Sequence, residues 1–137
     1  MEWTEALSTG NKTIDEQHKE LFAKINGLVQ AINHSVCKYK IGDVIKFLED
    51  YIEFHFGEEE KMMLRLSYPG YKAHKGQHEI FKRNFRRLKR ELIKLDGGKK
   101  PGSYNLSVQT NQIVVDWILE HIAKVDKNLG NFLSLPR

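Results

Sequence analysis

Four segments of this chain place apolar residues at the three- and four-residue spacing of a single helix face. Sequences that break helices separate these segments, notably Ser67 to Gly70, where a proline and a glycine stand together, and the glycine-rich stretch from Asp96 to Asn105. No segment shows the alternating pattern of a strand. Because amphipathic helices with short connections bury their apolar faces best side by side, we predict an all-α, antiparallel up-and-down four-helix bundle.

The ends of the helices carry their own signals. Thr13, followed three residues later by Glu16, is typical of a capping box and predicts the start of the first helix. An extended N-terminal arm should precede it. The fourth helix should run from about Ser107 to Lys124, and a short C-terminal helical piece should follow. With 137 residues, the chain 1–137 is expected to form a single domain.

Composition and charge exclude several classes of protein. No apolar run approaches the roughly 20 residues that span a bilayer, so we expect no membrane association. The N-terminus lacks the features of a signal peptide, and a single cysteine, Cys37, excludes an internal disulfide framework, which favours a cytoplasmic location. The net charge of +4 comes mainly from residues 82–90. We interpret that segment as a solvated helix face and expect no nucleic-acid partner.

The chain has six histidines, and five of them lie within or beside the apolar stripes. The sixth, His34, follows His18 by sixteen residues, which is roughly 160° around a helix, so it should face solvent. Burying five imidazoles without partners would destabilise a small domain, because each ring would lose its hydrogen bonds to water. A shared metal site would satisfy all five. The five inward histidines are His18, His55, His74, His78 and His121.

Carboxylates follow two of these histidines. Glu59 lies four residues after His55 on the same helix face, and Glu58, at three residues, is an alternative on geometry alone. We interpret Glu60 as part of an acidic, solvated face near the helix end, and Glu58 likewise if it is not a ligand.

In the third predicted helix the spacing of two candidate ligands fits one helix face, whereas in the fourth it does not. His74 and His78 are one turn apart, the arrangement by which one helix presents two imidazoles to one metal. Asp126 lies five residues after His121, which is about 140° around a regular helix. For Asp126 to join the site, either the turn must be locally widened, as at many functional sites, or the side chain must reach in from the flank of the stripe.

Together these motifs resemble the hemerythrin family, most closely its bacterial members. The resemblance covers nearly the whole chain in the family's order, and the full set is far more specific than any one motif. The loop from Asp96 to Asn105 is longer and more basic than in the short invertebrate carriers, which favours the bacterial branch. The matching elements are Trp3, Ile14-Asp15-Glu16-Gln17-His18, His55-Phe-x-x-Glu59-Glu60, His74-x-x-x-His78 and Trp117-x-x-x-His121-Ile-x-x-x-Asp126.

The resemblance implies a non-haem cofactor of two iron ions, Fe2+ or Fe3+, joined by a bridging oxo or hydroxo group. It also implies an asymmetric centre, since one iron would have six ligands and the other five, leaving one position open to a small molecule. By position, His74, His78 and His121 would bind the first iron, His18 and His55 the second, and Glu59 and Asp126 would bridge both.

From the resemblance we expect reversible dioxygen binding for oxygen storage, transport or sensing, and no enzymatic activity. Five neutral imidazoles among seven protein ligands favour the ferrous state and disfavour oxidation beyond diferric. Two alternatives remain open. One is a di-iron oxidoreductase acting on dioxygen or nitric oxide. The other is a redox or oxygen sensor within a larger signalling protein. The oxidoreductase would need a reductase as its partner, and the sensor would need a signalling partner. The residues predicted to line a dry oxygen pocket are Trp117, Phe22, Phe56, Ile25 and Ile122.

Overall fold

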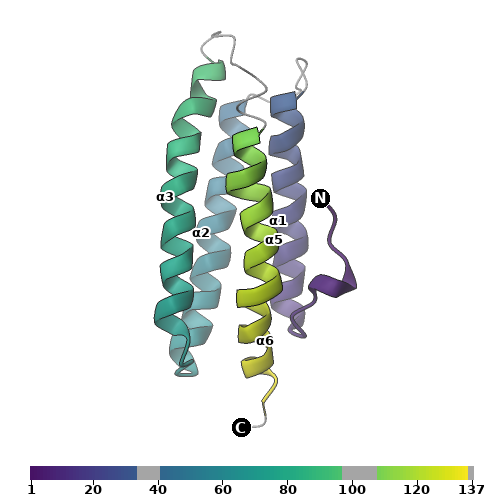
Figure 1. Cartoon of the computed structure of the whole chain (residues 1–137), viewed down its shortest axis with the longest axis vertical. Coiled ribbons are helices and arrows are strands. Elements are labelled where there is room, and N and C mark those ends of the chain that lie inside the picture. Colours follow the sequence, from purple (N-terminus) through teal and green to yellow (C-terminus); the bar gives the residue numbers. More distant parts are fainter. Residues whose placement is uncertain (34–40, 97–107, 136–137) are drawn as a thin grey trace.

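The computed structural model describes residues 1–33, 41–96 and 108–135. Within these ranges, four long helical segments lie side by side and run in alternating directions, and no strand occurs (Figure 1). The prediction of an all-α, antiparallel four-helix bundle is therefore confirmed. The predictions for His34, for Cys37 and for the loop that follows Asp96 lie outside the described residues. The first three helices are α1 (Lys12–Asn33), α2 (Ile41–Arg65) and α3 (Tyr71–Asp96).

The fourth segment is one continuous helical run with two widened turns. It comprises η2 (Asn111–Asp116), α5 (Trp117–His121), η3 (Ile122–Asp126) and α6 (Lys127–Leu133), and both η2 and η3 are π-helical. The predicted end of the fourth helix near Lys124 is wrong, because no proline or glycine interrupts the backbone before α6. The predicted C-terminal helical piece is α6, and it continues directly from the widened turn η3. None of the described helices is both long enough and apolar enough to cross a membrane.

The N-terminal arm is extended, as predicted, apart from one 3-10 turn, η1 (Glu5–Leu7). The prediction that Thr13 caps α1 is wrong, because the helix already begins at Lys12. The side chain of Asn11 is the cap, since its Oδ1 accepts a hydrogen bond of 3.0 Å from the backbone N–H of Ile14. Asparagine caps at least as well as threonine.

Asp15 ties this arm to the start of α1. Its carboxylate accepts hydrogen bonds from the Ser8 hydroxyl at 2.7 Å and from the backbone N–H and hydroxyl of Thr9, both at 2.8 Å. Burial alone would raise the pKa of Asp15, but these hydrogen bonds to the charged form outweigh burial and lower the pKa below its usual value. The arm is thus held to the bundle by an ionised carboxylate.

The turn between α2 and α3 lies where proline and glycine predicted it. Ser67 adopts a left-handed backbone conformation, with φ of 53°, and the N–H of Tyr68 donates to the carbonyl of Met63 at 2.9 Å, which closes the end of the helix. The turn places the first residues of α3 beside the last residues of α2. It therefore brings the histidines of α3 next to the carboxylates of α2.

The core has a larger and a smaller apolar cluster. The smaller one contains Ile14, Met63 and Leu129, and the larger one extends along the bundle from Leu21 on α1. On α1, His18 lies in sequence between Ile14 of the smaller cluster and Leu21 of the larger one. The buried Glu59 on α2 likewise lies in sequence between members of the two clusters, so apolar residues flank the candidate site on both sides along the bundle.

Candidate metal centre

The seven residues predicted as metal ligands lie together inside the bundle, and each is at most 3% exposed. All four helical segments contribute to them. Their possible ligand atoms form two groups, and within each group all atoms lie within 4.8 Å of one another. Both carboxylates belong to both groups, so three histidines gather on one side and two on the other. The three-histidine group contains His74, His78, His121, Glu59 and Asp126, and the two-histidine group contains His18, His55, Glu59 and Asp126.

Asp126 spans the two groups. Its Oδ2 lies 2.9 Å from Nε2 of His18, whereas its Oδ1 lies 3.0 Å from Nε2 of His74 and 3.1 Å from Nε2 of His121. Each oxygen of this carboxylate therefore faces a different set of histidines. That arrangement suits a ligand shared by two ions.

A widened turn brings Asp126 into the site. Residues Ile122–Asp126 form the π-helical turn η3, in which residues five apart lie nearly one above the other. Of the two alternatives that the sequence left open for Asp126, the locally widened turn is confirmed. A regular turn would have rotated this carboxylate about 140° away from His121.

Glu59, and not Glu58, lies in the site. Glu59 is fully buried, and its Oε1 lies 3.2 Å from Nε2 of His78 and 3.7 Å from Nε2 of His55. The side chain of Glu58 is 37% exposed and forms an ion pair of 3.6 Å with Lys61 at the surface. Burial thus identifies Glu59 as the candidate ligand, a choice that helix geometry alone left open between Glu58 and Glu59.

Polar side chains hold three of the histidines from behind. In each contact, a carboxylate or amide oxygen faces Nδ1 of the ring, where the amide orientation is assigned from the hydrogen-bond network. Because such oxygens only accept hydrogen bonds, Nδ1–H is the donor. The lone pair of each imidazole is then on Nε2, the atom that faces the site, as is usual for metal-ligating histidines. The contacts are His55 to Gln17 at 2.7 Å, His121 to Gln77 at 3.0 Å and His78 to Glu60 at 2.9 Å.

The prediction that Glu60 is solvated is wrong. Its side chain is only 16% exposed, because it turns toward His78 on the neighbouring helix α3. The roles of Gln17 and Gln77 were not recognised from the sequence. Each glutamine immediately precedes one ligand histidine in the sequence but contacts a ligand histidine on a neighbouring helix. Their position next to a predicted ligand is the sequence signal that could have identified them.

Many polar atoms of the site have no hydrogen-bond partner among the described residues. They include Nε2 of four histidines and both oxygens of Glu59 and of Asp126. Some of these atoms lie very close together, with Nε2 of His18 only 2.9 Å from Oδ2 of Asp126. Buried lone pairs that converge in this way would be costly without an ion between them. The donor set of imidazoles and carboxylates therefore fits a pair of metal ions.

Burial and crowding also shift the protonation of the site. Burial, followed by the charge of Asp126, raises the pKa of Glu59 to about 8. Burial would lower the pKa of His74, but the carboxylates of Asp126 and Glu59 outweigh it and raise this pKa to about 9. Burial, reinforced by His18, lowers the pKa of His55 to about 3. Without metal, protons therefore reside on Glu59 and His74 at neutral pH, while His55 stays neutral.

Two of the predicted pocket residues stack on ligand candidates. The ring of Phe56 lies 3.8 Å from that of His78 at an interplanar angle of 3°, and Trp117 lies 4.5 Å from His121 at 13°. Both aromatic residues therefore lie against the three-histidine group. The remaining three are buried members of the larger core cluster, namely Phe22, Ile25 and Ile122.

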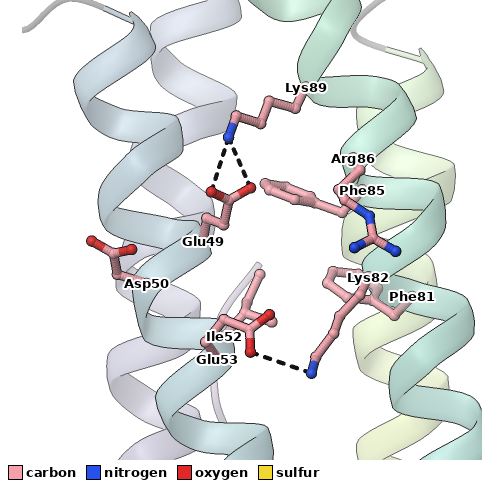
Figure 2. A pocket seen from close by; sticks show the side chains of 9 residues that line it. All are labelled: Glu49, Asp50, Ile52, Glu53, Phe81, Lys82, Phe85, Arg86 and Lys89. Carbon is pink, nitrogen blue, oxygen red and sulfur yellow. Dashed lines mark hydrogen bonds and ion pairs between the residues drawn. The ribbon is translucent and has the colours of Figure 1, made fainter.

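A groove of about 320 Å³ separates α2 from α3 at the surface (Figure 2). Two ion pairs join its walls, Lys89 with Glu49 at 2.9 Å and Lys82 with Glu53 at 3.3 Å. Part of the positive charge of residues 82–90 is thus paired with α2, in keeping with a solvated helix face. Ion pairs at a protein surface contribute about 0.2–1 kcal/mol each.

Comparisons with known proteins agree on one family. The model of the Hemerythrin HHE cation binding domain matches residues 9–133. A bacteriohemerythrin of Methylococcus capsulatus is 33% identical, with 98% of this chain and 97% of that protein covered. A bacteriohemerythrin of Clostridium acetobutylicum is 31% identical, with 91% and 95% covered. A crystal structure of wild-type hemerythrin superimposes with a TM-score of 0.81, at 31% identity and 98% coverage of both chains.

Proposed function

Since this chain belongs to the hemerythrin family, we propose that its buried histidine–carboxylate cluster holds a non-haem di-iron centre that binds dioxygen reversibly, for oxygen storage, transport or sensing. One observation carries the proposal: two groups of buried donors share both of their carboxylates, with three histidines on one side and two on the other. A single ion would not need two overlapping groups. Two ions would use every donor.

We assign the ligands by group. When bound, the irons and their oxo or hydroxo bridge supply the electrons and the coordination position that dioxygen requires. The two-histidine group offers one protein donor fewer than the other, so we infer that dioxygen enters on that side. The first iron takes His74, His78 and His121, the second takes His18 and His55, and Glu59 and Asp126 bind both.

The protein around the centre orients the donors and excludes water. Hydrogen bonds from Nδ1 fix the rings of His55, His78 and His121, so that Nε2 faces the site without a proton. The apolar core disfavours the release of oxygen as a reduced anion, because separating charge in a dry interior is costly. We propose that the buried Phe22, Ile25 and Ile122 help to keep the site dry.

Reversible binding is the expected result of a spectroscopic test. Protein purified and reduced without air, with two irons per chain, should gain a visible charge-transfer band on exposure to dioxygen and lose it on deoxygenation. Uptake should stop at one dioxygen per pair of irons. Irreversible bleaching on first exposure would contradict the proposal, and sustained oxygen consumption with a reductant would favour the oxidoreductase alternative.

The apparent affinity for metal should rise with pH through the neutral range and level off above about pH 9. A ligand must lose its proton before it binds a metal ion, and in the metal-free protein Glu59 has a pKa of about 8 and His74 of about 9. Calorimetric titration of Co2+ in buffers of different ionisation enthalpy should therefore show proton release at neutral pH. The release should diminish above pH 9. Uptake that releases no protons at neutral pH would contradict this prediction.

A further inference from the structure

We propose that Glu60, which lies outside the ligand groups, is a positioning residue that makes His78 the strongest donor of the three-histidine group. Through His78 it strengthens metal binding by that group and lowers the reduction potential of the centre. This inference rests on the proposed di-iron function. It names Glu60 as one cause of the metal affinity of the three-histidine group.

The geometry places a carboxylate directly behind the ring of His78. Oε2 of Glu60 lies 2.9 Å from Nδ1 of His78, and the histidine is fully buried. The ring of Phe56 stacks flat on the imidazole at 3.8 Å. Glu60 therefore fixes the direction of the ring while Phe56 fixes its plane, and Nε2 is left facing the site.

Among the described residues, the other four candidate ligand histidines have no equivalent carboxylate behind the ring. His55 and His121 donate to the neutral amides of Gln17 and Gln77, and Nδ1 of His18 has no hydrogen-bond partner among the described residues. Nδ1 of His74 likewise has none within the described part of the chain. A charged acceptor draws the Nδ1 proton more strongly than an amide does, which increases the electron density on Nε2. His78 is thus distinguished from the other four by charge.

Among the described residues, no lysine or arginine forms an ion pair with this carboxylate, although Lys82 and Lys75 lie near enough to act on its charge. Within the described ranges, the ion-pair contact of Glu60 is with His78, whereas the nearby Lys82 pairs with Glu53 at 3.3 Å and with Glu79 at 3.7 Å. The negative charge of Glu60 therefore acts on the three-histidine side of the centre. A nearby negative charge stabilises a ferric ion more than a ferrous ion, because the ferric ion carries the larger positive charge.

The first test replaces only the charge. Glu60→Gln keeps the size of the side chain and an oxygen that can accept from Nδ1. We expect this variant to bind Co2+ about 10- to 100-fold more weakly in the tighter of its two binding steps, which fills the three-histidine group with its one additional protein donor, as for other outer-shell substitutions. We also expect the loaded iron protein to show a more positive midpoint potential. Glu58→Gln is the matched control, because Glu58 lies on the same helix at the surface, and it should leave both quantities unchanged.

A second variant should shift the midpoint potential in the opposite direction. Gln77→Glu places a carboxylate behind His121, and Gln77 is an exposed residue, so the fold should tolerate the change. The midpoint potential should become more negative than that of the unmodified protein. The double variant Glu60→Gln with Gln77→Glu should return toward the original potential.

The outcomes separate this inference from the proposed function. If the unmodified protein binds no pair of metal ions, the proposed function fails. If it binds the pair, and Glu60→Gln folds with unchanged Co2+ affinity and potential, the role of Glu60 is overturned while the di-iron function stands. Should Glu60→Gln not fold, Gln77→Glu tests the premise that a carboxylate behind a ligand histidine lowers the potential, and an unshifted potential in that variant overturns the inference that depends on it.

Discussion

Replacing Asp126 by alanine should empty both metal sites at once. This carboxylate is the one that lies within 3.1 Å of histidines from both groups, with Oδ2 beside His18 and Oδ1 beside His74 and His121. Iron should fall from two per chain to fewer than one. The metal-loaded stability should drop by about 3 kcal/mol or more, because a broken buried cluster leaves its other members unsatisfied. Metal analysis and denaturant unfolding measure the two effects.

Asp116→Ala provides the control, since Asp116 is exposed and lies ten residues earlier in the same helical run. It should keep two irons and an unchanged unfolding midpoint. After chelation, the Asp126→Ala variant and the unmodified protein should differ much less, because the histidines can then become neutral. An Asp126→Ala protein that still held two irons would show that the bridging assignment is wrong.

Substituting Gly130 by alanine should detach the N-terminal arm and destabilise the bundle. A Cβ at this position would lie 2.1 Å from the backbone oxygen of Thr9, and the neighbouring Asp15 already holds Thr9 by two hydrogen bonds. The clash therefore involves backbone that cannot move without breaking other contacts. We expect a loss of about 1–3 kcal/mol, the range for overpacking, measured by urea unfolding. Faster proteolysis of the first ten residues should accompany it.

Gly76→Ala is the matched substitution in open space. No atom lies within 4 Å of a Cβ built on Gly76, which is an exposed residue within α3. Alanine there should stabilise the helix by about 0.5–1 kcal/mol, because it restricts the unfolded chain more than glycine does. If both substitutions proved equally harmless, close packing of the arm against α6 would be refuted.

The fold and the inward histidines were predictable because both depend on local periodicity. A residue such as His18, three and four positions before apolar neighbours, shares their helix face wherever the helix packs. That argument needs only the geometry of one helix. It therefore identified the five histidines that are buried in the described part of the chain before any contact between helices was known.

Local signals were less reliable where two of them competed. Thr13 and Asn11 are both good capping residues, and the helix begins after Asn11, which brings Ile14 into the core with no exposed surface. Similarly, the fourth helix continues past Lys124, where the sequence predicts its end. The widened turn η3 continues the helix instead of ending it.

The sequence by itself determined the four-helix class, the face of each helix that turns inward and the five histidines on those faces. It could do so because the apolar residues of each segment recur with the 3.6-residue period of a helix. Only the tertiary structure decided between Glu58 and Glu59, showed that the turn before Asp126 is widened, and turned Glu60 from solvent toward His78. Those choices depend on the rotation and distance of one helix relative to another. The spacing of residues along a single chain segment does not contain that information, whereas the packed bundle does.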